Sequence, residues 1–217
     1  MPSGIKGNHF IWLTLALVGL LVTGALSREF PYLPTLQLIE YSSIALLLVS
    51  LLSMQSNHAW MKRLAIILGL MLASVLVRDV TQYPAFEFSY LALMLVFYLV
   101  TAWLVASQVL LTGSVDLNKI VGAVALYLLL GLIWSIFYTV LIEVSPGSLK
   151  GIEPGAWYDN LPTTTYFSFV TLTTLGYGDI SPAKPMAQVV VVLEAVAGMF
   201  YLAVIVASLV GALRDKR

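Results

Sequence analysis

The chain has 217 residues, of which 60% are hydrophobic and 10% are charged, and its formal net charge is zero. Soluble domains are typically about 45–50% apolar and about 25% charged, so this composition excludes a disordered chain, a nucleic-acid binder and an ordinary cytosolic enzyme. It predicts an all-α membrane protein with several spans, because one membrane helix needs about 20 consecutive apolar residues. Cysteine is absent, which excludes a disulfide framework and a cysteine metal site.

Six long apolar runs predict six transmembrane helices. They lie at 10–26, 37–54, 61–77, 88–111, 120–144 and 186–213. The runs are continuous and not alternating, which favours helices over barrel strands. The first run could instead be a signal peptide, but its 17 residues exceed the usual apolar region of such peptides, so we expect an uncleaved helix.

The basic residues predict the orientation of these spans. Six spans place both termini on one side, together with Lys6, Lys62, Arg63, Lys119, Arg214, Lys216 and Arg217. The other side holds Arg28, Arg78, Lys150 and Lys184. Because cytoplasmic loops carry an excess of Lys and Arg, we expect a multi-pass protein of the plasma membrane with cytoplasmic termini. The charged groups near the predicted outer surface are expected to be solvated, with pairing among them as the alternative; they are Glu40, Arg78, Asp79 and Glu87.

A glycine-containing stretch, 171–179, interrupts the second half of the chain. It follows a long loop, 145–160, and an apolar segment, 162–173, that is too short to span a bilayer. Gly176 and Gly178 permit backbone conformations that a Cβ atom forbids. Non-helical backbone at membrane depth is tolerated where it is buried in protein or lines a water-filled cavity. The stretch therefore predicts a re-entrant loop whose carbonyls replace the hydration shell of a cation. One strand cannot encircle an ion, so we expect a cyclic oligomer.

This stretch resembles the selectivity filter of the potassium channels. The family motif Thr-x-x-Thr-x-Gly-Tyr-Gly-Asp is matched at every fixed position from Thr171 to Asp179. Leu175 stands where the family usually has Val or Ile. The resemblance implies a homotetramer with K⁺ ions, and no organic cofactor, in a filter formed by Thr174, Leu175, Gly176, Tyr177 and Gly178. The first four of these residues would bind K⁺.

The residues around this stretch predict its support. Asp159 or Asn160, with Pro162 in the first turn, indicates the start of a pore helix. The resemblance implies that aromatic residues pack behind the filter and that Tyr166 donates a hydrogen bond to Asp179. In some bacterial relatives a glutamate at the place of Val170 pairs with this aspartate, so we expect that pair to be absent. The predicted support residues are Thr171, Tyr166, Phe167, Asp179 and Glu194.

The last apolar run resembles the inner helix of the same family. Gly198 lies 20 residues after Gly178, where a hinge glycine is expected, and close helix packing is the alternative. We expect an apolar cavity and gate formed by Met199, Leu202, Val206 and Val210.

Glu194 is predicted to face the pore helix from the last run. We expect hydrogen bonds to Thr or backbone groups of the pore loop, with the acid protonated part of the time, because an unpaired carboxylate is costly there. A ring of acids that concentrates cations is the alternative.

The first half of the chain lacks a voltage sensor of the usual kind. Voltage-gated relatives carry Arg or Lys at every third position of the fourth span, whereas 88–111 has no charged residue. We divide the chain into a four-helix region, 1–117, and a pore domain, 118–217. The expected function is passive, K⁺-selective conduction by a channel in contact with membrane lipids, without enzymatic activity or nucleic-acid binding. The alternative is a membrane subunit of a K⁺ transport or sensor complex.

Overall fold

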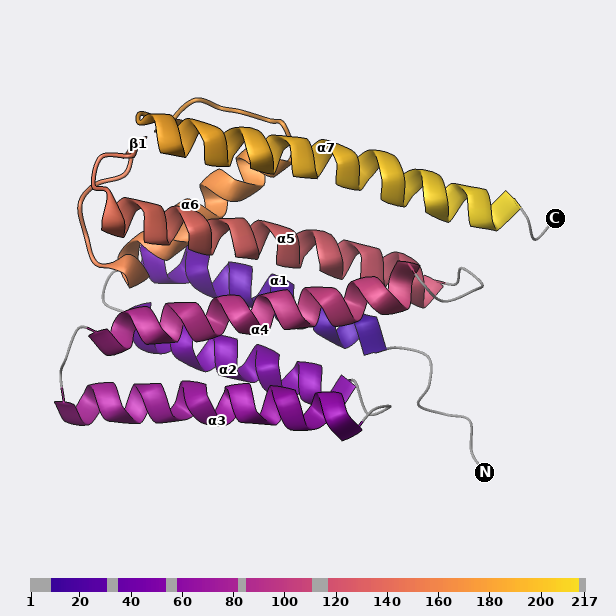
Figure 1. The fold of residues 1–217 in the computed structure, drawn as a ribbon, viewed down its shortest axis with the longest axis horizontal. Coiled ribbons are helices and arrows are strands. Elements are labelled where there is room, and N and C mark those ends of the chain that lie inside the picture. The colour runs from indigo at the N-terminus through magenta and orange to yellow at the C-terminus, as the bar shows by residue number, and fades with distance from the viewer. Residues whose placement is uncertain (1–8, 31–34, 54–57, 82–84, 111–116, 215–217) are drawn as a thin grey trace.

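The computed structural model describes residues 9–30, 35–53, 58–81, 85–110 and 117–214. These residues form seven α-helices and two short strands (Figure 1). In chain order they are α1 (His9–Glu29), α2 (Thr35–Ser53), α3 (His58–Thr81), α4 (Ala85–Leu110), α5 (Leu117–Val144), β1 (Leu149–Lys150), α6 (Trp157–Leu172), β2 (Ser181–Pro182) and α7 (Pro185–Arg214).

The six predicted apolar runs coincide with α1 to α5 and α7. Residues 54 and 111, at the ends of two runs, lie outside the described residues. Among the described helices, four hold a segment long and apolar enough to cross a membrane, namely Phe10–Glu29, Phe88–Val109, Leu117–Val144 and Pro185–Ile205. The chain is therefore an integral membrane protein built of helices.

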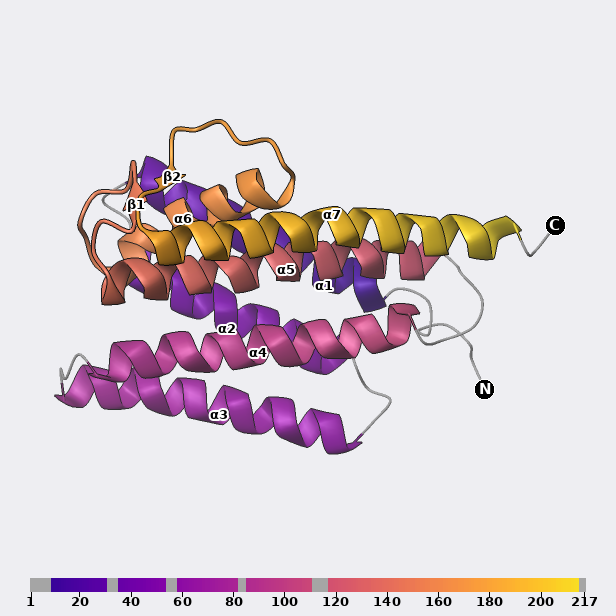
Figure 2. The same ribbon diagram turned by 45° about the horizontal axis from the view of Figure 1, so that its top comes forward.

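The long helices lie side by side, with α3 at one edge and α7 at the other (Figures 1 and 2). Helix α1 packs against α2 and α5, α4 packs against α3 and α5, and the short helix α6 packs against α5 and α7. Fully buried residues such as Leu17, Leu64, Phe97 and Leu129 form the core between them. The core is continuous from α1 to α7, so the first four helices pack directly on the second half of the chain.

Helix α6 is held unusually close to α5. A Cβ atom added to Gly131 of α5 would lie 2.6 Å from the ring of Phe169. The Ser168 hydroxyl donates to the Gly131 carbonyl at 2.8 Å, and the hydroxyls of Thr139 and Thr164 are 2.7 Å apart. The missing side chain at Gly131 therefore lets an aromatic ring and a hydroxyl of α6 reach the backbone of α5.

Helix α6 begins earlier than the sequence predicted. Its first residue is Trp157, and its N-cap is Ala156, which makes no side-chain capping bond. The Ala156 carbonyl accepts the backbone N–H groups of Asp159 and Asn160, and the Asn160 side chain donates to Gly155. Neither Asp159 nor Asn160 is thus the N-cap. Trp157 is buried, and burial of its indole provides the physical reason for the earlier start.

The loop between α5 and α6 is tied to the chain that leads into α7. Leu149 and Lys150 of β1 pair antiparallel with Ser181 and Pro182 of β2. Gly151 has a φ of +86°, and a Cβ atom there would lie 2.2 Å from the Asp179 carbonyl oxygen. Only glycine permits this backbone approach, which fixes the end of 171–179 nearest α7.

One buried acid contradicts the expectation of a solvated surface. Glu40 of α2 is 2% exposed, and its backbone carbonyl accepts a hydrogen bond from the Tyr90 hydroxyl at 3.5 Å. Packing of α2 against neighbouring helices, among them α4 through Tyr90, encloses this turn of α2. The side chains of Arg78, Asp79 and Glu87 lie outside the described ones.

The contact of Gly131 with Phe169 predicts a site-specific loss of stability. Gly131→Val should destabilise the fold by about 1–3 kcal/mol, because the added methyl groups displace the ring. Gly19→Val is the matched control, since a Cβ atom at this helical glycine meets nothing within 4 Å. Thermal unfolding in detergent measures both variants, and equal midpoints would contradict the close contact.

Candidate ion-binding site

The stretch after α6 has an alternating backbone. Thr173 is the C-cap of α6, and φ is then positive at every second residue: 59° at Thr174, 58° at Gly176 and 81° at Gly178. Thr174 is the one non-glycine residue with positive φ among the described ranges. Such alternation lets successive peptide groups point their carbonyl oxygens to one side of a strand and their N–H groups to the other. The two glycines adopt it without the strain of a Cβ atom.

The amide groups at the start of this stretch point back to α6. Thr174 N–H donates to the Thr171 carbonyl at 2.9 Å, and the N–H groups of Leu175 and Gly176 donate to the Val170 carbonyl at 3.0 and 3.2 Å. All residues from 173 to 179 are exposed in the single chain. The open side of the strand is therefore available to ions or to further copies of the chain.

Gly198 packs against the last carbonyl of α6. A Cβ atom at Gly198 would lie 2.2 Å from the Leu172 carbonyl oxygen, which also accepts a hydrogen bond from the Tyr127 hydroxyl at 3.2 Å. The packing interpretation of this glycine is thus supported by a direct contact. No observation tests its role as a hinge.

The predicted hydrogen bond between Tyr166 and Asp179 is confirmed. The Tyr166 hydroxyl donates to Asp179 Oδ2 at 2.8 Å, and this bond raises the pKa of the phenol. The Phe167 ring meets the Tyr138 ring edge-on, with the ring centroids 4.9 Å apart. Thr171 is half-buried and contributes its carbonyl to the turn described above. These three residues of α6 thus connect the helix to Asp179, to α5 and to the start of the following strand.

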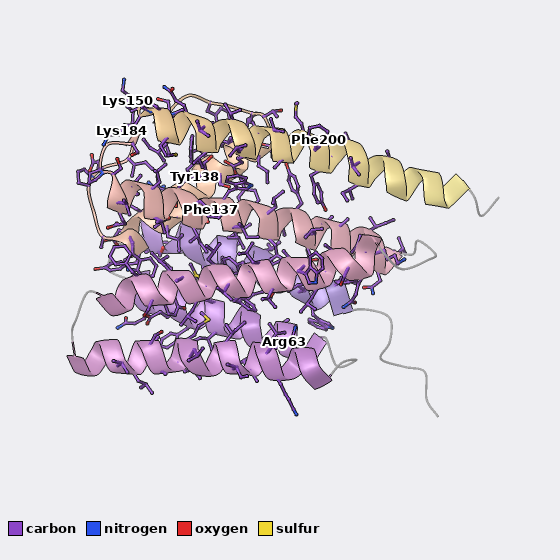
Figure 3. All side chains as sticks on the ribbon, in the orientation of Figure 1. Arg63, Phe137, Tyr138, Lys150, Lys184 and Phe200 are labelled. Atoms are coloured by element: carbon purple, nitrogen blue, oxygen red, sulfur yellow. The ribbon has the colours of Figure 1, made fainter. Side chains whose placement is uncertain are left out.

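Glu194 faces α6 from α7, as predicted from the sequence. Its hydrogen-bond partners differ from the predicted ones. It is fully buried. Its Oε2 atom accepts a hydrogen bond from the Tyr138 hydroxyl of α5, and its Oε1 atom lies 2.5 Å from the Ser168 hydroxyl of α6 (Figure 3 labels Tyr138). The expected Thr and backbone partners are therefore wrong. Tyr138 was missed because its distance of 56 residues along the chain carries no local signal.

The number of hydrogen atoms shared by Glu194, Ser168 and Tyr138 favours a neutral carboxyl group at Glu194. Ser168 has one hydroxyl hydrogen, and the Gly131 carbonyl, which also contacts this hydroxyl, can only accept. If Ser168 donates to Gly131, the contact with Glu194 Oε1 needs a hydrogen from the acid. The protonated acid then donates to Ser168 and accepts from Tyr138, so that all three contacts are satisfied.

The predicted gate residues are only partly described. Leu202 is 45% exposed and Met199 is 58% exposed in the single chain. The side chains of Val206 and Val210 lie outside the described ones. The described part of this face is open and apolar.

Two comparisons with known proteins bear on this site. A family model described as "Ion channel" matches residues 122–215. The inward rectifier potassium channel Kirbac3.1 of Paramagnetospirillum magnetotacticum is 36% identical over 79 residues, which are 36% of this chain and 24% of the relative's length. No solved structure matches the chain significantly. Residues 122–215 of this chain are therefore similar to an ion-channel domain, and the relative that matches part of the chain is a potassium channel.

The hydrogen-bond pattern around Glu194 predicts opposite outcomes for two substitutions. Glu194→Gln should unfold within a few degrees of the original chain, because an amide donates to Ser168 and accepts from Tyr138 as the neutral acid does. Glu194→Ala leaves the buried Tyr138 hydroxyl without its acceptor, at about 1–3 kcal/mol, whereas Ser168 keeps its bond to the Gly131 carbonyl. Thermal unfolding in detergent measures both. A loss in the Gln variant as large as that in the Ala variant would indicate a charged carboxylate instead.

Proposed function

We propose that this chain is one subunit of a homotetrameric, K⁺-selective channel that conducts passively across the plasma membrane, with both termini cytoplasmic. The observation that carries the proposal is the alternating positive φ at Thr174, Gly176 and Gly178 within a complete filter motif. The match of residues 122–215 to the ion channel model supports it.

The proposed ion sites lie along the open side of the strand. The N–H groups of Leu175 and Gly176 are turned toward α6, so the alternation directs the carbonyls of Thr174, Leu175, Gly176 and Tyr177 to the other side. Four strands around one axis would provide rings of these oxygens, which replace the water shell of K⁺. The C-terminal end of α6 adds partial negative charge below them.

The exposed surface of the single chain supports assembly around such an axis. Leu175 and Tyr177 are 55% and 67% exposed. Helix α7 also presents large exposed apolar side chains along much of its length, among them Val189, Val192, Val196, Met199 and Leu202. A contiguous apolar surface of this kind is covered by lipid or by other protein. Four copies would cover the filter side and enclose a cavity between their α7 helices.

The gate is proposed at the lower part of this cavity. Leu202, Val206 and Val210 follow Gly198 at intervals of four residues, which places them on one helix face. A constriction lined only by alkyl groups closes to ions by dewetting.

Selective permeation tests the proposal directly. In bilayers with purified protein, the reversal potential should follow the K⁺ gradient and not the Na⁺ gradient, and Ba²⁺ should block. Gly176→Ala should abolish selectivity, because alanine disfavours the observed φ of +58°. Gly147→Ala is the matched control, since Gly147 has a φ of +76° and open space but lies in the outer loop. Equal K⁺ and Na⁺ permeability in the original chain would refute the proposal.

Opening should depend weakly on voltage. One elementary charge that crosses the field contributes about 2.3 kcal/mol per 100 mV, and residues 88–110 of α4 carry none. The slope of conductance against voltage should therefore correspond to less than about one gating charge. A steep curve equivalent to several charges would reveal a sensor elsewhere in the chain.

A further inference from the structure

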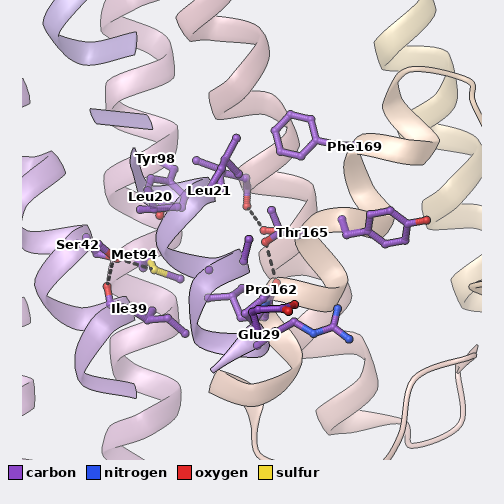
Figure 4. A pocket seen from close by; sticks show the side chains of 18 residues that line it. Leu20, Leu21, Glu29, Ile39, Ser42, Met94, Tyr98, Pro162, Thr165 and Phe169 are labelled. Carbon is purple, nitrogen blue, oxygen red and sulfur yellow. Dashed lines mark hydrogen bonds between the residues drawn. The ribbon is translucent and has the colours of Figure 1, made fainter. Parts of the chain in front are cut away.

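A cavity of about 530 Å³ separates the pore helix α6 from the first helices of the chain. Side chains from α1, α2, α4, α5 and α6 line it (Figure 4). Figure 4 shows Leu20, Leu21 and Phe169 around one end and Glu29 with Pro162 at the other. Its volume falls within the range of about 300–1,000 Å³ that ligand sites occupy. This cavity lies on the far side of α6 from α7 and is separate from the filter strand.

We propose that this cavity binds one acyl chain of a zwitterionic phospholipid, with the headgroup at Arg28 and Glu29. The site itself depends on the cavity alone. Its effect on conduction rests on the proposed channel function.

The interior of the cavity suits a hydrocarbon chain better than water. Four of its hydroxyl groups already donate to other atoms: Ser42 to Ile39, Ser43 to Met94, Ser135 to Leu132 and Thr165 to Leu161. A buried water needs about two to four polar partners, and these four hydroxyls can only accept a hydrogen bond from it. The remaining surface is supplied mainly by Leu, Ile, Met, Pro and aromatic side chains.

The length of the cavity fits one leaflet of a bilayer. Along α1 it extends from Leu20 to Glu29, which is about 14 Å at 1.5 Å per residue. Half of a hydrocarbon core of about 30 Å is about 15 Å. An acyl chain that enters beside Glu29 would therefore end near Leu21 and Phe169.

The two charged residues at the end of the cavity near Glu29 determine which phospholipid headgroup fits there. Arg28 and Glu29 are consecutive, exposed and of opposite sign, and both line the cavity. A phosphate is a strong acceptor for a guanidinium group, and the ammonium group of phosphatidylethanolamine would meet the carboxylate. An anionic lipid without an ammonium group would satisfy Arg28 but not Glu29.

An occupant of this cavity would contact the support of the filter. Tyr166 and Phe169 both line the cavity. Tyr166 donates to Asp179 at one end of the filter, and Phe169 packs on Gly131. Loss of the acyl chain would free both rings to move, so we expect lower K⁺ conductance when the cavity is left empty.

Photolabelling tests the site without any measurement of ion flux. The full chain is reconstituted in phosphatidylethanolamine–phosphatidylglycerol vesicles that contain phosphatidylethanolamine with a diazirine at the end of one acyl chain. Labelled peptides should cover residues 20–25 and 165–169. Ala25→Trp should lower this labelling about tenfold, or about 1.4 kcal/mol in affinity, because the indole fills the cavity from an exposed position. Ala65→Trp, at an exposed position of α3 outside the lining, should leave it unchanged.

The other outcomes contradict the proposal in separate ways. If these peptides are not labelled, there is no lipid in the cavity. Equal labelling in the Ala25→Trp and Ala65→Trp variants would exclude it as well. Equal labelling by a diazirine phosphatidylglycerol or a free diazirine fatty acid would refute the assigned headgroup. A chain that is labelled as expected but does not conduct K⁺ would refute the channel proposal and retain the lipid site.

Discussion

Helix α6 and the strand that follows it contain more polar groups than an apolar surrounding tolerates without partners. An unsatisfied backbone or hydroxyl group costs several kcal/mol in a membrane, so the neighbouring helices must supply the missing bonds. Tyr127 of α5 binds the Leu172 carbonyl, Ser168 reaches the backbone of α5, and Glu194 of α7 joins Ser168 to Tyr138. The position of α6, and with it the path of 173–179, follows from these three connections and from the glycines that allow the close approach.

Much of this architecture could be predicted from the sequence. The apolar runs gave the helices because burial in lipid requires long uninterrupted segments, and the motif from Thr171 to Asp179 indicated the strand and its glycine conformations. The hydrogen bond between Tyr166 and Asp179 could be predicted because the resemblance to the potassium channels implies it. The depth of Glu194 followed from helix geometry alone.

The remaining contacts had no local signal. Tyr138 and Glu194 are 56 residues apart, and nothing in the neighbourhood of either residue selects the other. The approach of Phe169 to Gly131 and the cavity beside it depend on how three or more helices meet, which the composition of one helix does not determine. The start of α6 at Trp157 reflects burial of an indole against Tyr90, whose ring centroid lies 6.1 Å away, and capping preferences alone missed it.

The pairing of β1 with β2 divides the loop between α5 and α6 into two parts with different tolerance to changes in length. From Ser145 to Gly151 the loop is fixed by backbone pairing, by the Lys184 ammonium on Ser145 and Pro146, and by the contact of Gly151 with Asp179. One extra residue there would shift the register and move Asp179. Glu153 and Pro154 are exposed, and insertions are accommodated best where backbone is exposed and makes few hydrogen bonds. An epitope or fluorophore sequence inserted between these two residues would therefore label this loop and leave the position of Asp179 unaltered.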